Sequence, residues 1–144
     1  MTTQKIEFFY EVGGFKLHEE SMLRTWLNKS CMLESYKLEH LNFIYCDDEY
    51  LLKMNKEYLN HDYYTDIITF DNSEDEGVIE GDIFISVDRA KDNAKNFEQD
   101  FMREIERLMI HGLLHLIGYA DKSNEEKSQM TAKEDYYLSI LDKT

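Results

Sequence analysis

Two histidines four residues apart, inside an apolar run, constrain the fold of this chain more than any other feature. The run covers residues 109–121 and contains His111 and His115. Four residues is just over one helical turn, so on a helix both imidazoles project from the same face. Gly118 follows three residues later and predicts the end of that helix, and Asp121 comes just after the turn. The pattern predicts a helix with two histidines on one face and a loop that folds back toward them.

These three side chains predict a metal site. Two imidazoles and a carboxylate are suitable donors for a zinc-like ion, and three protein ligands leave a fourth position open. An open position is more typical of catalysis than of structural metal binding. Other interpretations stay open, because a histidine pair on a helix need not bind metal. Asp121 alone is equally consistent with a helix N-cap or a solvated loop carboxylate.

The residue after the first histidine argues against a peptidase of the common kind. The zinc-peptidase motif His-Glu-x-x-His uses its glutamate as general base, and Gly112 occupies that position here. A peptidase reaction would need another carboxylate, although a metal can still lower the pKa of bound water toward about 7. Gly112 is also explained if another segment packs closely against the helix. The residues themselves do not identify a general base.

Length and charge limit the class of protein. One domain over residues 1–144 is expected from the length of 144 residues. The formal net charge of −14 argues against an ordinary nucleic-acid binder, because phosphate contacts supply much of such affinity. It does not exclude one, since a metal ion and a few arginines can create a positive cleft on an acidic body.

The sequence also predicts a cytoplasmic location without a membrane partner. No stretch approaches the roughly 18 apolar residues of a membrane span, and residues 1–10 lack the pattern of a secretory signal. Cys31 and Cys46 show no metal-type spacing, and we expect buried free thiols.

Hydrophobic periodicity predicts an α+β fold in which a small mixed β-sheet packs against helices. Strands are expected at residues 6–10, 38–46, 65–70 and 78–87. Helices are expected at residues 17–33, 48–58, 97–117 and 124–141, the last opened by a capping box of Ser123 and Glu126. A further helix, capped by Ser86 or Asp88, is expected to run to about residue 96.

Three blocks of the sequence carry a family resemblance. Residues 111–121 read His-Gly-Leu-Leu-His-Leu-Ile-Gly-Tyr-Ala-Asp, and the second block joins Asn55 and Tyr58 to residues 62–70. The third block is residues 81–86, Gly-Asp-Ile followed closely by serine. In order and spacing these blocks resemble the YbeY family of bacterial endoribonucleases and ribosomal RNA maturation factors. The family signature in the first block is His-Gly-x-Leu-His-Leu-x-Gly-Tyr-Asp-His.

The resemblance implies a zincin-like metal-site helix and one zinc ion, or another divalent transition metal, held by His111, His115 and Asp121. It also implies cleavage of single-stranded RNA during ribosomal RNA processing. The implied partners are ribosomal RNA, the small ribosomal subunit and ribosome-associated proteins. Asp121 stands where the family has its third histidine. A carboxylate is a harder donor than imidazole, so the site should tolerate manganese better.

Other positions follow from the matched blocks. The family arginine after the Asn-x-x-Tyr element falls on Leu59, so the candidates for RNA contact are Arg89, Arg103 and Arg107. The last two are equally explained as partners of nearby glutamates at i, i+4 spacing. Asp66 and Asp82 are expected to orient a ligand histidine or line the cleft, or else to make turn hydrogen bonds.

Tyr63 and Tyr64 are candidates for stacking on unpaired bases. Two other functions stay open. One is a metal-dependent hydrolase of another substrate, such as a peptide. The other is a non-enzymatic ribosome assembly factor with a structural metal.

Overall fold

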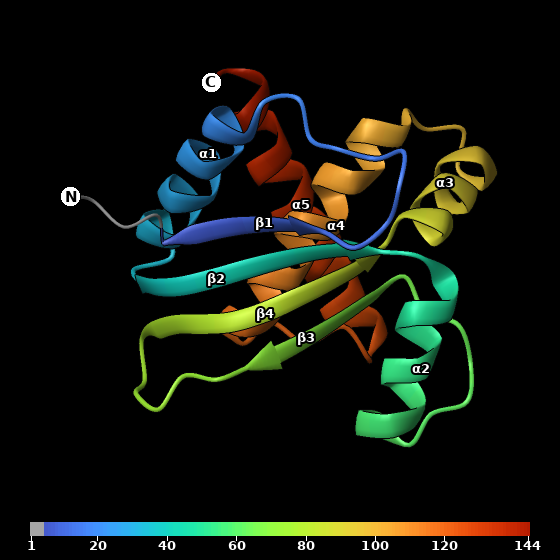
Figure 1. The fold of residues 1–144 in the computed structure, drawn as a ribbon. Coiled ribbons are helices and arrows are strands. Elements are labelled where there is room, and N and C mark those ends of the chain that lie inside the picture. Colours follow the sequence, from blue (N-terminus) through green and yellow to red (C-terminus); the bar gives the residue numbers. More distant parts are fainter. Residues whose placement is uncertain (1–4) are drawn as a thin grey trace.

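The strands form one mixed four-stranded sheet in a computed structural model that describes residues 5–144 (Figure 1). Its order is β1-β2-β4-β3, in which β1, β2 and β4 run parallel and β3 runs antiparallel to β4. The strands are β1 (Ile6–Tyr10), β2 (Lys37–Cys46), β3 (Ile67–Asp71) and β4 (Val78–Ser86). β3 is therefore an edge strand of the sheet.

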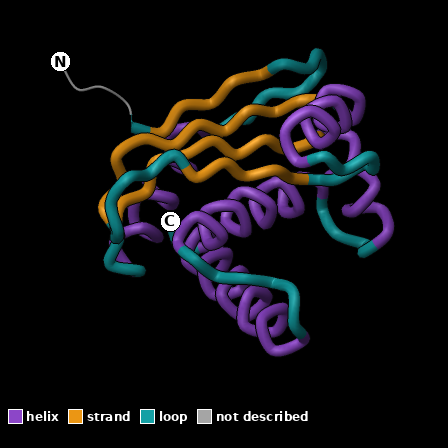
Figure 2. The backbone as a smooth tube through the Cα atoms, turned by 90° about the horizontal axis from the view of Figure 1, so that it is seen from below, coloured by secondary structure: helices purple, strands orange, loops and turns teal. Residues whose placement is uncertain are grey.

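Five helices cover the two faces of the sheet unequally (Figure 2). α4 packs beneath β3 and β4, α1 packs on β2, and α5 packs against both α1 and α4. α2 lies on the opposite face, where it contacts β3 and β4. The helices are α1 (Glu20–Leu33), α2 (Asp48–Leu59), α3 (Val87–Asn96), α4 (Phe101–Ile117) and α5 (Asn124–Asp142).

The side chains of β4 alternate between two hydrophobic clusters, one on each face of the sheet. Ile83 and Ile85 are fully buried in the large core with α4, whereas Phe84 packs against the smaller cluster beneath α2. Side chains of a strand point alternately to its two faces, so each position in β4 faces either α4 or α2.

Gly112 lets α4 lie close against the sheet. A Cβ atom at this position would come within 2.9 Å of two side-chain carbons of Ile83 and 3.1 Å of Ile67. This confirms close packing as the explanation of the glycine. It also means that a side chain at position 112 would point into the sheet.

The α+β fold with a small mixed sheet is confirmed, as is the capping box of Ser123 and Glu126. Two helix starts differ from the prediction. α1 begins at Glu20 rather than at residue 17. α4 begins at Phe101 rather than at residue 97, because Glu98 has a positive φ of 52° and Asp100 caps the helix through Arg103 N.

Cys31 and Cys46 are buried free thiols, as predicted. Within residues 5–144, no helix combines the length and the apolar character needed to cross a membrane.

Candidate metal centre

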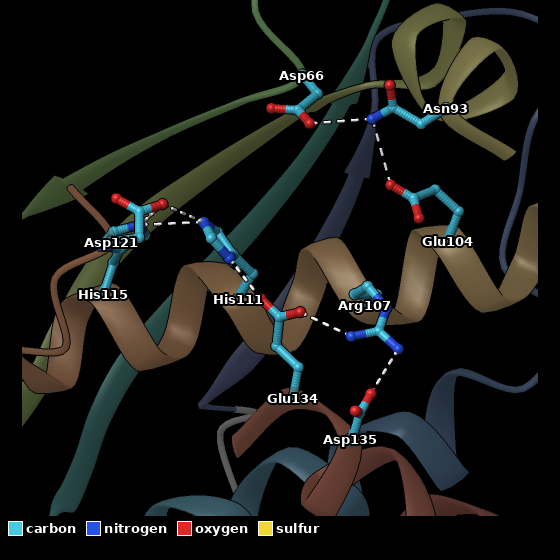
Figure 3. A network of polar contacts seen from close by, with 9 residues as sticks. All are labelled: Asp66, Asn93, Glu104, Arg107, His111, His115, Asp121, Glu134 and Asp135. Carbon is cyan, nitrogen blue, oxygen red and sulfur yellow. Dashed lines mark hydrogen bonds and ion pairs between the residues drawn. The ribbon is translucent and has the colours of Figure 1, made fainter. Parts of the chain in front are cut away.

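The end of α4 and the loop after it bring three donor atoms together, as predicted from the spacing (Figure 3). His111 and His115 lie one turn apart on α4, and Gly118 ends the helix with a φ of 121°. Asp121 then folds back over both rings. The two Nε2 atoms are 3.0 Å apart, and Asp121 Oδ2 lies 3.3 Å from His115 Nε2 and 3.4 Å from His111 Nε2.

This triangle fits a tetrahedral ion. Bonds of about 2.0–2.1 Å at tetrahedral angles separate neighbouring ligand atoms by roughly 3.3 Å. The three observed separations of 3.0, 3.3 and 3.4 Å agree with that spacing. Two imidazoles and one carboxylate can therefore hold a divalent metal ion here.

The triangle opens onto a hollow of about 380 Å³. The ligands form one wall, and the end of α2, the loop that follows it and β3 form the other. The side chains of His111, His115 and Asp121 are 19%, 27% and 38% exposed, respectively. A metal ion bound by these three residues would keep a position open toward the hollow.

Sequence reasoning missed Glu134, which approaches the centre from α5. Its Oε2 atom lies 2.6 Å from His111 Nδ1, the ring nitrogen that faces away from Asp121 (Figure 3). Burial by itself lowers the pKa of His111, but the hydrogen bond with Glu134 and the charges of nearby carboxylates outweigh burial and raise it. The only sequence signal was a glutamate within the buried stripe of α5, between Met130 and Leu138.

Comparison with known proteins decides the family. The family model described as Endoribonuclease YbeY matches residues 12–142. The chain belongs to the YbeY family. A protein of Cytophaga hutchinsonii named Endoribonuclease YbeY is 54% identical over 140 residues, which cover 97% of this chain and 98% of that protein. A protein of the same name from Karelsulcia muelleri is 48% identical over 138 residues, 96% of each chain.

A solved structure shares the fold. The solution structure of TM1509 from Thermotoga maritima superposes with a TM-score of 0.68 at 27% identity, covering 94% of this chain and 88% of that one. The family model and the named relatives confirm the sequence resemblance to the YbeY family. Its relatives are named as endoribonucleases, which are hydrolases that act on RNA.

Asp66, one of the two acidic residues expected near the YbeY centre, lines the hollow. Its Oδ2 atom accepts a hydrogen bond of 3.0 Å from Asn93 Nδ2, which also lies 3.2 Å from Glu104 Oε2. Burial raises the pKa of Glu104, and the charge of Asp66 acts in the same direction. Asp66 therefore lines the hollow, and its side chain contacts Asn93 on α3 rather than a histidine of the metal triangle.

The placement of Asp82 in the cleft is wrong. Its neighbour Ile83 points to α4, so Asp82 points to the opposite face of the sheet. There it accepts hydrogen bonds from Asn42 Nδ2 at 2.9 Å and from Asn72 Nδ2 at 3.2 Å.

The three candidate arginines lie outside the hollow and pair with acidic residues. Arg89 pairs with Asp48 and Asp92, and Arg103 pairs with Glu106 and Asp142. Arg107 contacts Glu134 at 2.8 Å and Asp135 at 2.7 Å, both on α5. The expectation of i, i+4 glutamate partners is corrected as well, since these partners lie at i+3 or on another helix.

The structure also places His61 in the hollow. Its ring stacks on Tyr63 with centroids 5.1 Å apart, and Tyr63 Oη lies 3.0 Å from His61 Nδ1. The buried Asn55 of the second YbeY block donates a hydrogen bond of 2.9 Å to Tyr63 O and so holds this loop. Tyr64 lies apart from the hollow and donates to Glu49.

Proposed function

We propose that the chain is a zinc-dependent endoribonuclease that cuts single-stranded RNA during ribosomal RNA maturation. The observation that carries this proposal is the triangle of His111, His115 and Asp121, which opens onto a hollow in a member of an endoribonuclease family. Zinc is the ion of choice because two of the three donors are imidazoles, and the carboxylate lets manganese replace it. Residues 1–144 would act as one catalytic domain.

The residues that line the hollow would have different roles in the reaction. A metal ion held at this site would act as a Lewis acid and would lower the pKa of bound water. His111, His115 and Asp121 would bind it and fix the open position toward the hollow. Asp66 and His61 line the same hollow and can exchange protons with a nucleophile or a leaving group held there.

The wall opposite the ligands suits an unpaired strand of RNA. The stacked rings of His61 and Tyr63 offer an aromatic surface, and such surfaces bind bases that are free to leave a stack. Tyr63 is 56% exposed, so a base can reach its ring.

The net charge of the protein favours an RNA substrate that is presented within a larger assembly. A net charge of −14 gives the free protein little long-range attraction for RNA. The three arginines are already paired with carboxylates. We therefore infer that ribosomal RNA is presented in the small ribosomal subunit, together with ribosome-associated proteins, in the cytoplasm.

Two features weigh against the alternative functions. A side chain at position 112 would point into the sheet, so the glutamate of the common peptidase motif has no place here. A purely structural metal in an assembly factor is typically enclosed by four protein ligands. Here the three ligand side chains border the hollow.

The decisive test uses one RNA sequence as a single strand and as a duplex. Metal-stripped protein, zinc-reloaded protein and His115→Ala are compared by gel analysis of end-labelled RNA. We expect that only the zinc-reloaded wild-type protein cleaves the RNA, and that it cleaves the single strand but not the duplex. His18→Ala, at an exposed histidine outside the hollow, should match the wild type. Cleavage retained by metal-free His115→Ala would contradict the proposal.

A further inference from the structure

A chain of polar contacts leads from the metal triangle across to α5 (Figure 3). Glu134 Oε2 lies 2.6 Å from His111 Nδ1, and Glu134 Oε1 accepts a hydrogen bond of 2.8 Å from Arg107. Arg107 also donates to Asp135 at 2.7 Å. Each carboxylate oxygen of Glu134 therefore has its own partner on α4.

The position of Glu134 selects one form of His111. A neutral imidazole carries one N–H, and an ionised carboxylate can only accept. With Glu134 beside Nδ1, the hydrogen lies on Nδ1 and the lone pair lies on Nε2. That Nε2 atom is the one that faces His115 and Asp121.

Packing alone does not account for a carboxylate at this position. Glu134 is only 6% exposed and sits among the buried residues of α5, next to Met130 and Leu138 along the stripe. Burial of a charge is costly even when the charge is paired, and an apolar residue often serves stability equally well. The benefit of Glu134 must therefore be sought in the histidine that it contacts.

We propose that Glu134, held by Arg107, is a positioning residue that prepares His111 to bind the metal and couples metal binding to the docking of α5 on α4. The inference rests on the metal site of the proposed function. Carboxylates that orient ligand histidines in other metal sites change metal affinity about 10–100-fold when they are replaced. Because coupling is reciprocal, a bound ion should also strengthen the packing of α5 on α4.

Zinc affinity of the full chain, measured by competition with a chromogenic chelator, tests the role of Glu134. Glu134→Gln keeps the reach of the side chain and removes its charge. Glu134→Asp keeps the charge and shortens the reach. We expect both variants to bind zinc about 10-fold to 100-fold more weakly than the wild type.

Asp135→Asn is the matched control. Asp135 is the next residue on α5 and pairs with the same arginine, but its side chain is 60% exposed and lies outside the contact with His111. We expect its zinc affinity to stay within about threefold of the wild type, less than the loss expected for an orienting carboxylate. Wild-type affinity in either folded Glu134 variant would overturn the inference.

Thermal melting of the metal-free proteins separates positioning from simple stabilisation. If Glu134 only stabilised the α4–α5 pair, its variants would melt earlier without metal and would bind zinc normally once folded. If one Glu134 variant fails to fold, the other still decides the question. If the wild type binds zinc but does not cleave RNA, the proposed nuclease function is wrong and this inference still holds. Absence of zinc binding by the wild type would overturn both.

Discussion

Individual residues of the centre depart from the YbeY pattern in ways that their surroundings explain. Asp121 replaces a histidine, and its shorter side chain still reaches both imidazoles because Gly118 ends α4 and lets the loop turn back. Leu59 replaces an arginine at the rim of the hollow, next to the stacked His61 and Tyr63. At this place the protein therefore presents an apolar side chain beside stacked aromatic rings, where the family pattern has a positive charge.

Gly112 gives a prediction at the scale of a single atom. Gly112→Ala adds a Cβ atom 2.9 Å from two side-chain carbons of Ile83, so the Ile83 side chain or the helix must shift to accept it. Overpacking of this kind costs about 1–3 kcal/mol of the free energy of unfolding, to be measured by denaturant titration. Gly13→Ala is the control, because a Cβ there meets nothing within 4 Å. Equal stability of the two variants would contradict the packing argument.

At the scale of helices and strands, the features that depend only on the spacing of residues within one segment were predictable. The spacing of apolar residues and the turn after the second histidine predicted the C-terminal part of α4 and the three donor residues that the structure brings together, because those residues lie within one helix and its following loop. Glu134 was not predictable, since its contact depends on how α5 crosses α4. The position of Asp82 was wrong because alternation alone does not tell which face of β4 a helix covers.

The arginines illustrate the same limit. Helical spacing predicted partners within α4, but Arg107 reaches across to two acidic residues of α5. The start of α4 was also misplaced, because the apolar character of Phe97 continued the helical pattern through a turn. Only the positive φ of Glu98 and the cap from Asp100 mark the break.

Glu34 joins three elements and gives a prediction about pH. At the end of α1, it accepts hydrogen bonds from Tyr119, which precedes Asp121 in the ligand loop, and from Lys133 and Tyr137 of α5. Burial acts to raise the pKa of Glu34, but the hydrogen bonds from Tyr137, Tyr119 and Lys133 outweigh it and lower the pKa. A pKa below the ordinary value of about 4.3 means that this stabilisation is present above that pH and is lost as the pH falls through the lowered pKa.

Glu34→Gln should therefore destabilise the protein most at neutral pH. We expect a loss of about 1.5–3 kcal/mol in the free energy of unfolding near pH 7, typical of hydrogen bonds to a charged group. The loss should shrink in acid, as the pH falls from about 4.3 through the lowered pKa and the wild-type carboxyl also takes up a proton. Urea titrations at pH 7 and at a series of pH values below about 4 measure this, with the exposed Glu74→Gln as control. A loss that did not depend on pH would exclude the ionic contribution of Glu34.

At the scale of the whole molecule, metal binding and stability should be linked. The ligands lie on α4 and the loop that follows it, and Glu134 ties them to α5. A ligand that binds only the folded state stabilises it by about 2.7 kcal/mol at 100 times its Kd. Calorimetry should show a Tm several degrees higher with zinc than with a chelator, and His115→Ala should show no such difference. An equal Tm of the wild type in both conditions would argue against the metal centre.

The two walls of the hollow come from separate stretches of the chain, and this separation has an evolutionary consequence. Residues 55–69 form one wall and residues 111–121 form the other. If the proposed function holds, substitutions in the first stretch can change how RNA is held while the candidate metal ligands in the second stretch stay intact. The wall that faces the substrate and the group that would hold the metal can therefore vary separately, and Leu59 in the place of the family arginine, beside the retained pair of His111 and His115, is an example.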